Sequence, residues 1–93
     1  MKSAFWGQRR LEYIKHHRKG FYISLVIGCE LNRYLADINK QAEEMFNTLI
    51  SQYKTSEGIT EKLKADNQMQ WVGLMNNIRQ RATETVNVEL IYA

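Results

Sequence analysis

Residues 31–60, LNRYLADINKQAEEMFNTLISQYKTSEGIT, decide the fold of this chain. Within them, apolar residues recur every three or four positions, at Leu31, Leu35, Ile38, Ala42, Met45, Leu49 and Tyr53. This spacing is typical of a heptad seam along one face of an α-helix. We therefore predict a helix over residues 30–57 that ends at Gly58. Thr60 is a favourable N-cap for the helix that follows, with Glu61 in its first turn.

A second amphipathic pattern covers residues 60–91, with a kink expected near Asp66. The three-residue turn between the two helices leaves them antiparallel, so together they form a long hairpin. Gly73 is expected to mark a close helix crossing, and residues 86–93 either fray or extend the helix. Seven apolar residues are expected to be largely buried and to face one another across the hairpin, namely Leu35, Ile38, Met45, Leu49, Trp71, Met75 and Ile78.

The N-terminal third predicts two shorter helices. The first covers residues 6–19, with Gly20 as its left-handed cap, and the second covers the apolar residues 21–27 and stops at Gly28. Residues 21–27 leave a strand open as an alternative, but no partner strand exists elsewhere, and the chain has no proline. The sequence therefore predicts a single all-α domain over residues 1–93. In this small helical bundle, two short N-terminal helices pack on a long antiparallel hairpin.

Composition narrows the class of protein. The chain of 93 residues is 44% hydrophobic and 25% charged, which is ordinary for a globular domain. Its longest apolar run, residues 21–28, is too short to cross a bilayer, and no secretory leader opens the chain. The single cysteine, Cys29, is interpreted as a small core residue of a protein in a reducing compartment. We therefore expect a cytoplasmic protein with no membrane contact.

Positive charge is concentrated at the N-terminus. Residues 1–20 hold six basic residues and one acidic residue, whereas the other 73 hold seven basic and nine acidic residues. Such a cluster favours phosphate contacts with nucleic acid, and Phe5 and Trp6 beside it are suited to stack on bases. The alternative is a solvated helix face whose two aromatic residues dock in the core. The candidate phosphate-binding residues are Arg9, Arg10, Lys15, Arg18 and Lys19.

Residues 20–37 have some features of a helix-turn-helix. In that interpretation Gly28 supplies the permissive backbone that the turn needs, and Asn32 and Arg33 at the start of the second helix read base edges. The alternative is a plain helical corner, favoured by the length of the second helix, its apolar seam and its acidic residues.

Sequence motifs of enzymes are missing. There is no phosphate-binding glycine loop, zinc-protease motif, Cys-x-x-Cys pair or nucleophile elbow. His16 and His17 are adjacent on a helix and point about 100° apart, so they are unsuited to clamp one metal ion. We expect no enzymatic activity, no metal, no cofactor and no small-molecule substrate.

Several stretches carry a resemblance to a known family. They are WGQRR at 6–10 with Tyr13, LNRYLADI at 31–38, LKADNQMQWV at 63–72 with MNNIR at 75–79, and ELIY at 89–92. Together they resemble the TnpV family, small accessory proteins encoded in conjugative and mobilisable transposons of Firmicutes. The resemblance implies a DNA-associated protein, sometimes compared with excisionases, and supplies no catalytic residue. Its relatives carry a further segment before the Trp-Gly-Gln motif, so we expect a short or trimmed member. A winged-helix excisionase needs a strand hairpin that this sequence does not predict.

These observations lead to two functional hypotheses. The first is a transposon accessory protein that contacts DNA through its basic arm, while a recombinase encoded elsewhere performs strand chemistry. The second is a helical protein–protein interaction module without nucleic-acid contact. Because the long helices carry more apolar surface than two short helices cover, we expect a homodimer through the hairpin. The candidate interface or core residues are Phe46, Ile50, Tyr53, Trp71 and Met75.

Overall fold

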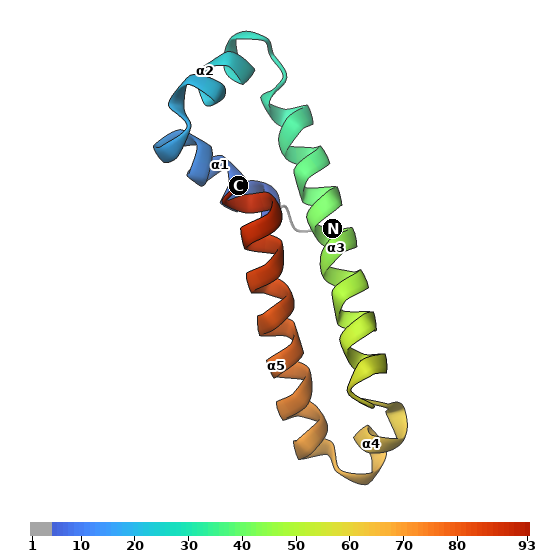
Figure 1. Cartoon of the computed structure of the whole chain (residues 1–93). Helices are drawn as coiled ribbons and strands as arrows, with labels where there is room; N and C mark the ends of the chain where they lie inside the picture. The colour runs from blue at the N-terminus through green and yellow to red at the C-terminus, as the bar shows by residue number, and fades with distance from the viewer. Residues whose placement is uncertain (1–4) are drawn as a thin grey trace.

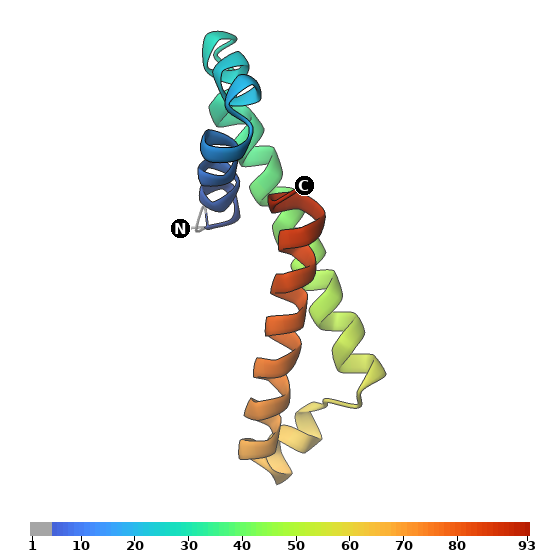
Figure 2. The same cartoon turned by 60° about the vertical axis from the view of Figure 1, so that its left-hand side comes forward.

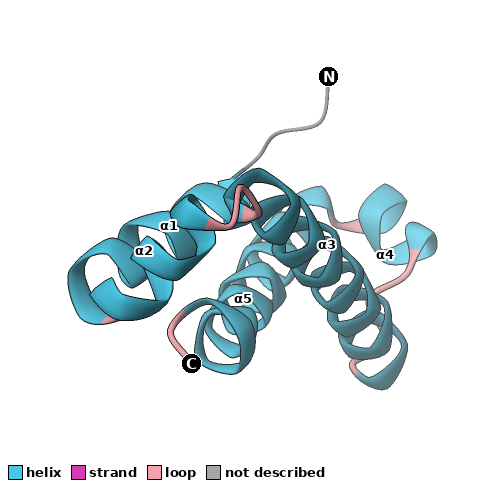
Figure 3. Cartoon of the chain, turned by 90° about the horizontal axis from the view of Figure 1, so that it is seen from above, coloured by secondary structure: helices cyan, strands magenta, loops and turns pink. Residues whose placement is uncertain are grey.

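The computed structural model describes residues 5–93, and every regular element in this range is helical (Figure 3). The predicted all-α fold is therefore confirmed. In chain order the elements are α1 (Phe5–His17), α2 (Lys19–Ile27), α3 (Leu31–Ser56), α4 (Glu61–Asp66), α5 (Gln68–Val86) and the π-helical turn η1 (Asn87–Ile91).

Helices α3 and α5 form the predicted antiparallel hairpin, and α4 lies at its closed end (Figure 1). At the other end α3 extends past the last turn of α5, and α1 and α2 lie against this extension (Figure 2). The molecule is elongated, with extents of 55 × 25 × 18 Å. No helix in the described part of the chain combines the length and apolar character needed to cross a membrane.

The second arm of the hairpin is broken where the kink was expected. Asn67 separates α4 from α5, and its side-chain Oδ1 accepts a hydrogen bond of 3.2 Å from the N–H of Gln70. Thr60 caps α4 in the predicted way, because its Oγ1 accepts from the N–H of Leu63 at 3.2 Å. Two local caps thus start two helices within eight residues. The last residues extend the arm as the π-helical turn η1.

Both ends of α3 are framed by turns of the same kind. At Gly58, with φ +67°, the N–H of Ile59 bonds to the carbonyl of Lys54 at 2.9 Å, a Schellman motif. After α2 the N–H of Glu30 bonds in the same way to the carbonyl of Leu25 at 2.9 Å.

The residue in the left-handed conformation of that second turn is Cys29, with φ 57°. The prediction that Gly28 supplies the permissive backbone is therefore wrong, since its φ is −77°. Cys29 is exposed and not a core residue. Gly20 is not a left-handed cap either, because it lies inside α2 and the chain changes direction at Arg18.

Most of the buried apolar residues form two clusters. One joins α1, α3, α5 and η1 around Trp6, Ile38, Ala42, Val86 and Ile91. The other lies near the closed end of the hairpin around Ile59, Met75 and Ile78. Of the seven residues predicted to face one another, three are buried and four, Leu35, Met45, Leu49 and Trp71, are half-buried.

Candidate nucleic-acid interface

The first turn of α1 is held tightly against α3. Trp6 is 6% exposed in the core, so of the two interpretations of its ring, the docked one is correct. A Cβ on Gly7 would lie 3.0 Å from the main-chain oxygen of Leu35, so a larger residue does not fit without a shift. The Oδ1 of Asn39 accepts from the N–H groups of Trp6 (3.2 Å) and Gly7 (3.3 Å), which have no partner within their own helix. The close helix approach expected at Gly73 is therefore found at Gly7, since Gly73 has nothing within 4 Å of an added Cβ.

Arg10 is a structural residue that ties α1 to the end of the chain. Its side chain is 7% exposed, and its Nε donates to the hydroxyl of Tyr34 at 2.9 Å. Its Nη1 donates to the main-chain oxygens of Ile91 (3.0 Å) and Ala93 (2.9 Å). Carbonyls at a helix C-terminus lack intrahelical donors and carry partial negative charge, so Arg10 caps η1. This geometry counts against the predicted phosphate contact of Arg10, and we leave it out of the candidate interface.

The exposed positive charge of the N-terminal region is concentrated where α1 turns into α2. We call Lys15, Arg18 and Lys19 the basic corner. Arg18 and Lys19 are exposed and Lys15 is half-buried, with its Nζ 5.8 Å from the centre of the Tyr22 ring. Arg18 donates a hydrogen bond of 3.3 Å to the main-chain oxygen of Ala93 at the surface. None of the three forms an ion pair with any residue in the described range 5–93.

A shallow groove runs along α1 beside Tyr92, open to solvent and with a volume of about 600 Å³. The side chains that line it are mostly aromatic or basic. They are Phe5, Gln8, Arg9, Glu12, Tyr13, His16, His17 and Tyr92.

Aromatic rings follow one another along this groove. The Tyr13 ring lies 5.0 Å from the ring of His17 and 5.5 Å from the ring of Tyr92. The guanidinium of Arg9 lies 4.3 Å above the Phe5 ring and donates to Oδ1 of Asn87 at 3.1 Å. The groove thus combines exposed aromatic faces with a fixed positive charge.

The remaining candidates for base readout lie apart from the basic corner. Asn32 and Arg33 are exposed in the first turn of α3, beyond the far end of α2. The nine residues of α2 separate the two places by about 14 Å along the helix axis. The residues proposed from the sequence therefore divide among the groove, the corner, the core and the α2–α3 turn.

Comparison with known proteins identifies the family. The family described as "Transposon-encoded protein TnpV" matches residues 2–91 of the 93-residue chain. The chain belongs to the TnpV family. No curated protein and no solved structure matches it.

In this TnpV chain three of the stretches that carry the family resemblance meet in space. The first contributes Trp6, Gly7 and Arg10, the second contributes Tyr34, and the last contributes the carbonyl of Ile91. This part of the family pattern therefore specifies how α1 is joined to α3 and η1.

The residues proposed as interface or core in this TnpV chain pack into the two core clusters of a single copy. Met75 is buried, and the other four are half-buried members of the two core clusters. These four are Phe46, Ile50, Tyr53 and Trp71. The exposed large apolar residues lie elsewhere, and four of them are on α2.

In the described part of the TnpV chain, residues 5–93, no group of three His, Cys, Asp or Glu side chains is placed to bind a metal ion. His16 and His17 both line the groove, and the Glu12 carboxylate lies 3.5 Å from Nε2 of His16.

Sequence reasoning missed the aromatic groove. Tyr13 and Tyr92 lie 79 positions apart, and only the packing of η1 on α1 brings their rings together. Both residues belong to stretches of the family resemblance, which was the available signal. No sequence pattern indicates the role of Asn39, because a side chain that caps a neighbouring helix stands at no fixed distance in sequence from the turn that it caps.

Proposed function

We propose that this transposon-associated protein is a non-catalytic accessory factor that contacts DNA, while a recombinase encoded elsewhere performs strand chemistry. The observation that carries the proposal is the basic corner. Its three cationic residues lie within five positions of the chain at the turn from α1 to α2, and none of them pairs with an Asp or Glu side chain in the described range. The base readout by Asn32 and Arg33 stays a prediction.

The electrostatics of the corner favour a polyanion. Each cation that neutralises a phosphate releases a condensed counterion, so the affinity falls as salt rises. The body of the chain is close to neutral, with seven basic and nine acidic residues after residue 20. A duplex is therefore attracted to one part of this surface and not to the whole.

The test is a salt titration of duplex binding by fluorescence anisotropy. The variant carries Lys15→Gln, Arg18→Gln and Lys19→Gln. The matched control carries Lys40→Gln, Lys62→Gln and Arg79→Gln, which remove the same charge from exposed positions elsewhere. We expect the slope of log K against log salt to fall by about 2–3 in the first variant and to change less in the control.

Two results would contradict the proposal. Equal losses in both variants would mean that net charge, and not the corner, attracts DNA. Absence of binding by the unmodified protein to both duplex and single-stranded DNA at low salt would remove DNA association altogether. Duplexes from the ends of the transposon, titrated beside random duplexes, separate site recognition from non-specific association.

A second candidate function is a protein–protein interaction module, and the surface of α2 favours it. Phe21, Ile23, Val26 and Ile27 are 38%, 52%, 46% and 77% exposed on a helix of nine residues. Because these exposed apolar side chains are stabilised by burial against a second copy, we place the proposed homodimer here and not along the hairpin. Analytical ultracentrifugation at micromolar concentration tests this, with Ile27→Lys expected to convert the dimer to a monomer. A monomer without any substitution would contradict it.

A further inference from the structure

We infer that the groove on α1 binds an unpaired base of single-stranded DNA. The inference rests on the proposed function and deepens it, since it assigns the base to the groove and the phosphates to the basic corner.

The shape of the groove suits a flat ring. Its volume of about 600 Å³ lies within the range of small-ligand sites, and its open form admits a base that remains attached to a strand. Phe5 and Tyr92 are 46% and 49% exposed, so part of each ring is accessible to a base, while the guanidinium of Arg9 occupies one face of the Phe5 ring. Tyr13 contacts the Tyr92 ring on one side and the His17 ring on the other, which fixes the aromatic floor between them.

The charges around the groove place the backbone of the strand. His17 lines the groove as the last residue of α1, and Arg18 of the basic corner follows it directly. A strand whose base enters the groove therefore has cations for its phosphates at the neighbouring corner. Arg9 supplies a further cation inside the groove itself, held by its bond to Asn87.

Glu12 favours the base over the phosphate as the part of the ligand that enters the groove. Its carboxylate in the groove repels phosphate, but it is able to accept a hydrogen bond from an exocyclic amino group of a base. This distribution of charge fits a base in the groove better than it fits the backbone.

Stacking on aromatic side chains requires the face of a base. In a duplex the faces are covered by neighbouring base pairs and only the edges are accessible, whereas a single strand exposes them. Every base has an aromatic face, so this mode of binding tolerates sequence differences. The groove therefore predicts a preference for single strands that does not depend on a particular site.

The experiment compares two labelled 12-nucleotide strands by fluorescence anisotropy. One is ordinary single-stranded DNA, and the other has the same phosphates but abasic sugars. We expect the ordinary strand to bind about 5- to 100-fold more tightly, the factor typical of stacking one base. The double variant Phe5→Leu/Tyr92→Leu is expected to lose this preference and to keep its salt dependence.

Met69→Ala is the control variant. Met69 is an apolar side chain with 87% exposure at the start of α5, at the opposite end of the hairpin from α1 (Figure 1). Its removal is expected to leave the preference for the ordinary strand unchanged. An equal loss of preference in the control would overturn the assignment of the base to the groove.

Photocrosslinking of the unmodified protein to a bromodeoxyuridine strand gives a second readout that needs no variant. Cross-links at Phe5, Tyr13 or Tyr92 support the groove, and cross-links confined to other regions overturn it. Equal, salt-dependent binding of ordinary and abasic strands also overturns the groove and leaves the basic corner standing. Absence of binding to either strand at low salt overturns the proposed function as well.

Discussion

The closed end of the hairpin and the junction of α1 with the rest of the molecule are held together in different ways. At the closed end, residues 54–70, the turn and cap hydrogen bonds join groups three to five positions apart. At the junction, the side chains of Arg10 and Asn39 bond to groups 24 to 83 positions away. One long-range side-chain pair, Glu57 with Arg81, also bridges the closed end.

The difference determines how each region responds to substitution. When a local cap is lost, the neighbouring hydrogen bonds still hold its turn, and water is able to bond to the freed main-chain groups. A buried side chain at the junction satisfies several main-chain groups at once, and its removal leaves them without partners or solvent. We therefore expect single substitutions to cost most at the junction and least at the closed end.

Arg10→Leu is expected to have the largest effect. It removes the bonds to Tyr34, Ile91 and Ala93 and leaves the buried carbonyl of Ile91 without a donor. We expect the free energy of unfolding to fall by about 3 kcal/mol, measured by urea denaturation. Arg9→Leu is the matched control, because the neighbouring arginine is half-buried and makes one side-chain hydrogen bond, so its loss is expected to cost below about 1 kcal/mol.

Equal costs for the two arginine variants would contradict the comparison. Arg10→Lys sharpens it, because an ammonium group on a flexible stem cannot reproduce the fork of a guanidinium. We expect its stability to lie between those of the wild type and the leucine variant.

Gly7→Ala is expected to rank next. The new Cβ would lie 3.0 Å from the main-chain oxygen of Leu35, and α1 has to move off α3 to accept it. We expect a loss of about 1–2 kcal/mol, despite the higher helix propensity of alanine. Gly73→Ala meets nothing within 4 Å in α5, so there the propensity acts alone and we expect a gain of about 0.5–1 kcal/mol. Thermal unfolding followed by circular dichroism gives the sign of the stability change in each variant. A gain in stability in both variants would show that α1 and α3 move apart at Gly7 at little cost.

The elements that sequence reasoning predicted are those with local causes. The seam of α3, the stop at Gly58, the cap at Thr60 and the break beside Asp66 each depend on residues within one or two turns. The left-handed turn residue was misplaced because a Schellman turn favours glycine, and Cys29 holds that position one residue after Gly28.

The candidate site was predicted less well, for a physical reason. The density of charge in the sequence correctly indicates a basic N-terminal helix, but it does not distinguish the half-buried Arg9 from the buried Arg10. Their different surroundings depend on where η1 packs, 80 residues later in the chain. The groove depends on the same packing, since it brings Tyr92 to Tyr13.

The two left-handed turn positions allow a reciprocal test with smaller effects. Gly58→Ala forces a side chain into positive φ at the closed end, and we expect a loss of about 1 kcal/mol. Cys29→Gly removes the same strain from the other turn, and we expect a gain of about 0.5 kcal/mol, because a more flexible unfolded chain offsets part of it. Urea denaturation of both variants measures these values, and a loss at Cys29→Gly would mean that its side chain contributes to the fold.

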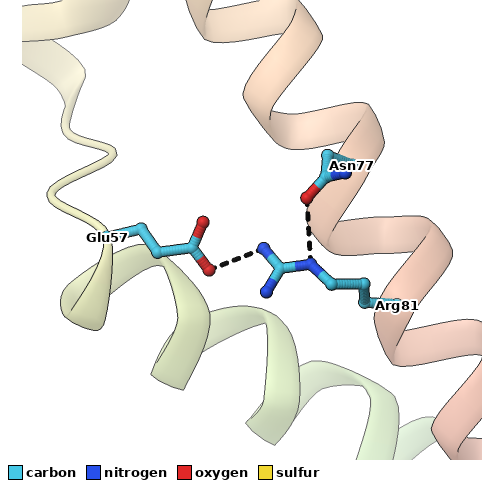
Figure 4. A network of polar contacts seen from close by, with 3 residues as sticks. All are labelled: Glu57, Asn77 and Arg81. Carbon is cyan, nitrogen blue, oxygen red and sulfur yellow. Dashed lines mark hydrogen bonds and ion pairs between the residues drawn. The ribbon is translucent and has the colours of Figure 1, made fainter.

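The smallest effect is expected for the ion pair that bridges the closed end (Figure 4). The Nη2 of Arg81 lies 2.6 Å from Oε2 of Glu57, but the two side chains are 39% and 34% exposed, so water competes with the pair. In a double-mutant cycle of Glu57→Ala and Arg81→Ala we expect a coupling energy below about 1 kcal/mol. Because the partners are exposed, the coupling is expected to decrease further in 1 M salt.

The single variants of this cycle are expected to differ. Arg81 also donates to Oδ1 of Asn77 at 2.9 Å, and its guanidinium lies 4.7 Å from the centre of the Tyr53 ring. Arg81→Ala therefore removes three contacts and Glu57→Ala removes one, so the arginine variant is expected to lose more stability. A coupling energy as large as the cost of Arg10→Leu would contradict the distinction between the two regions. It would mean that the closed end, like the α1 junction, depends on a long-range side-chain contact.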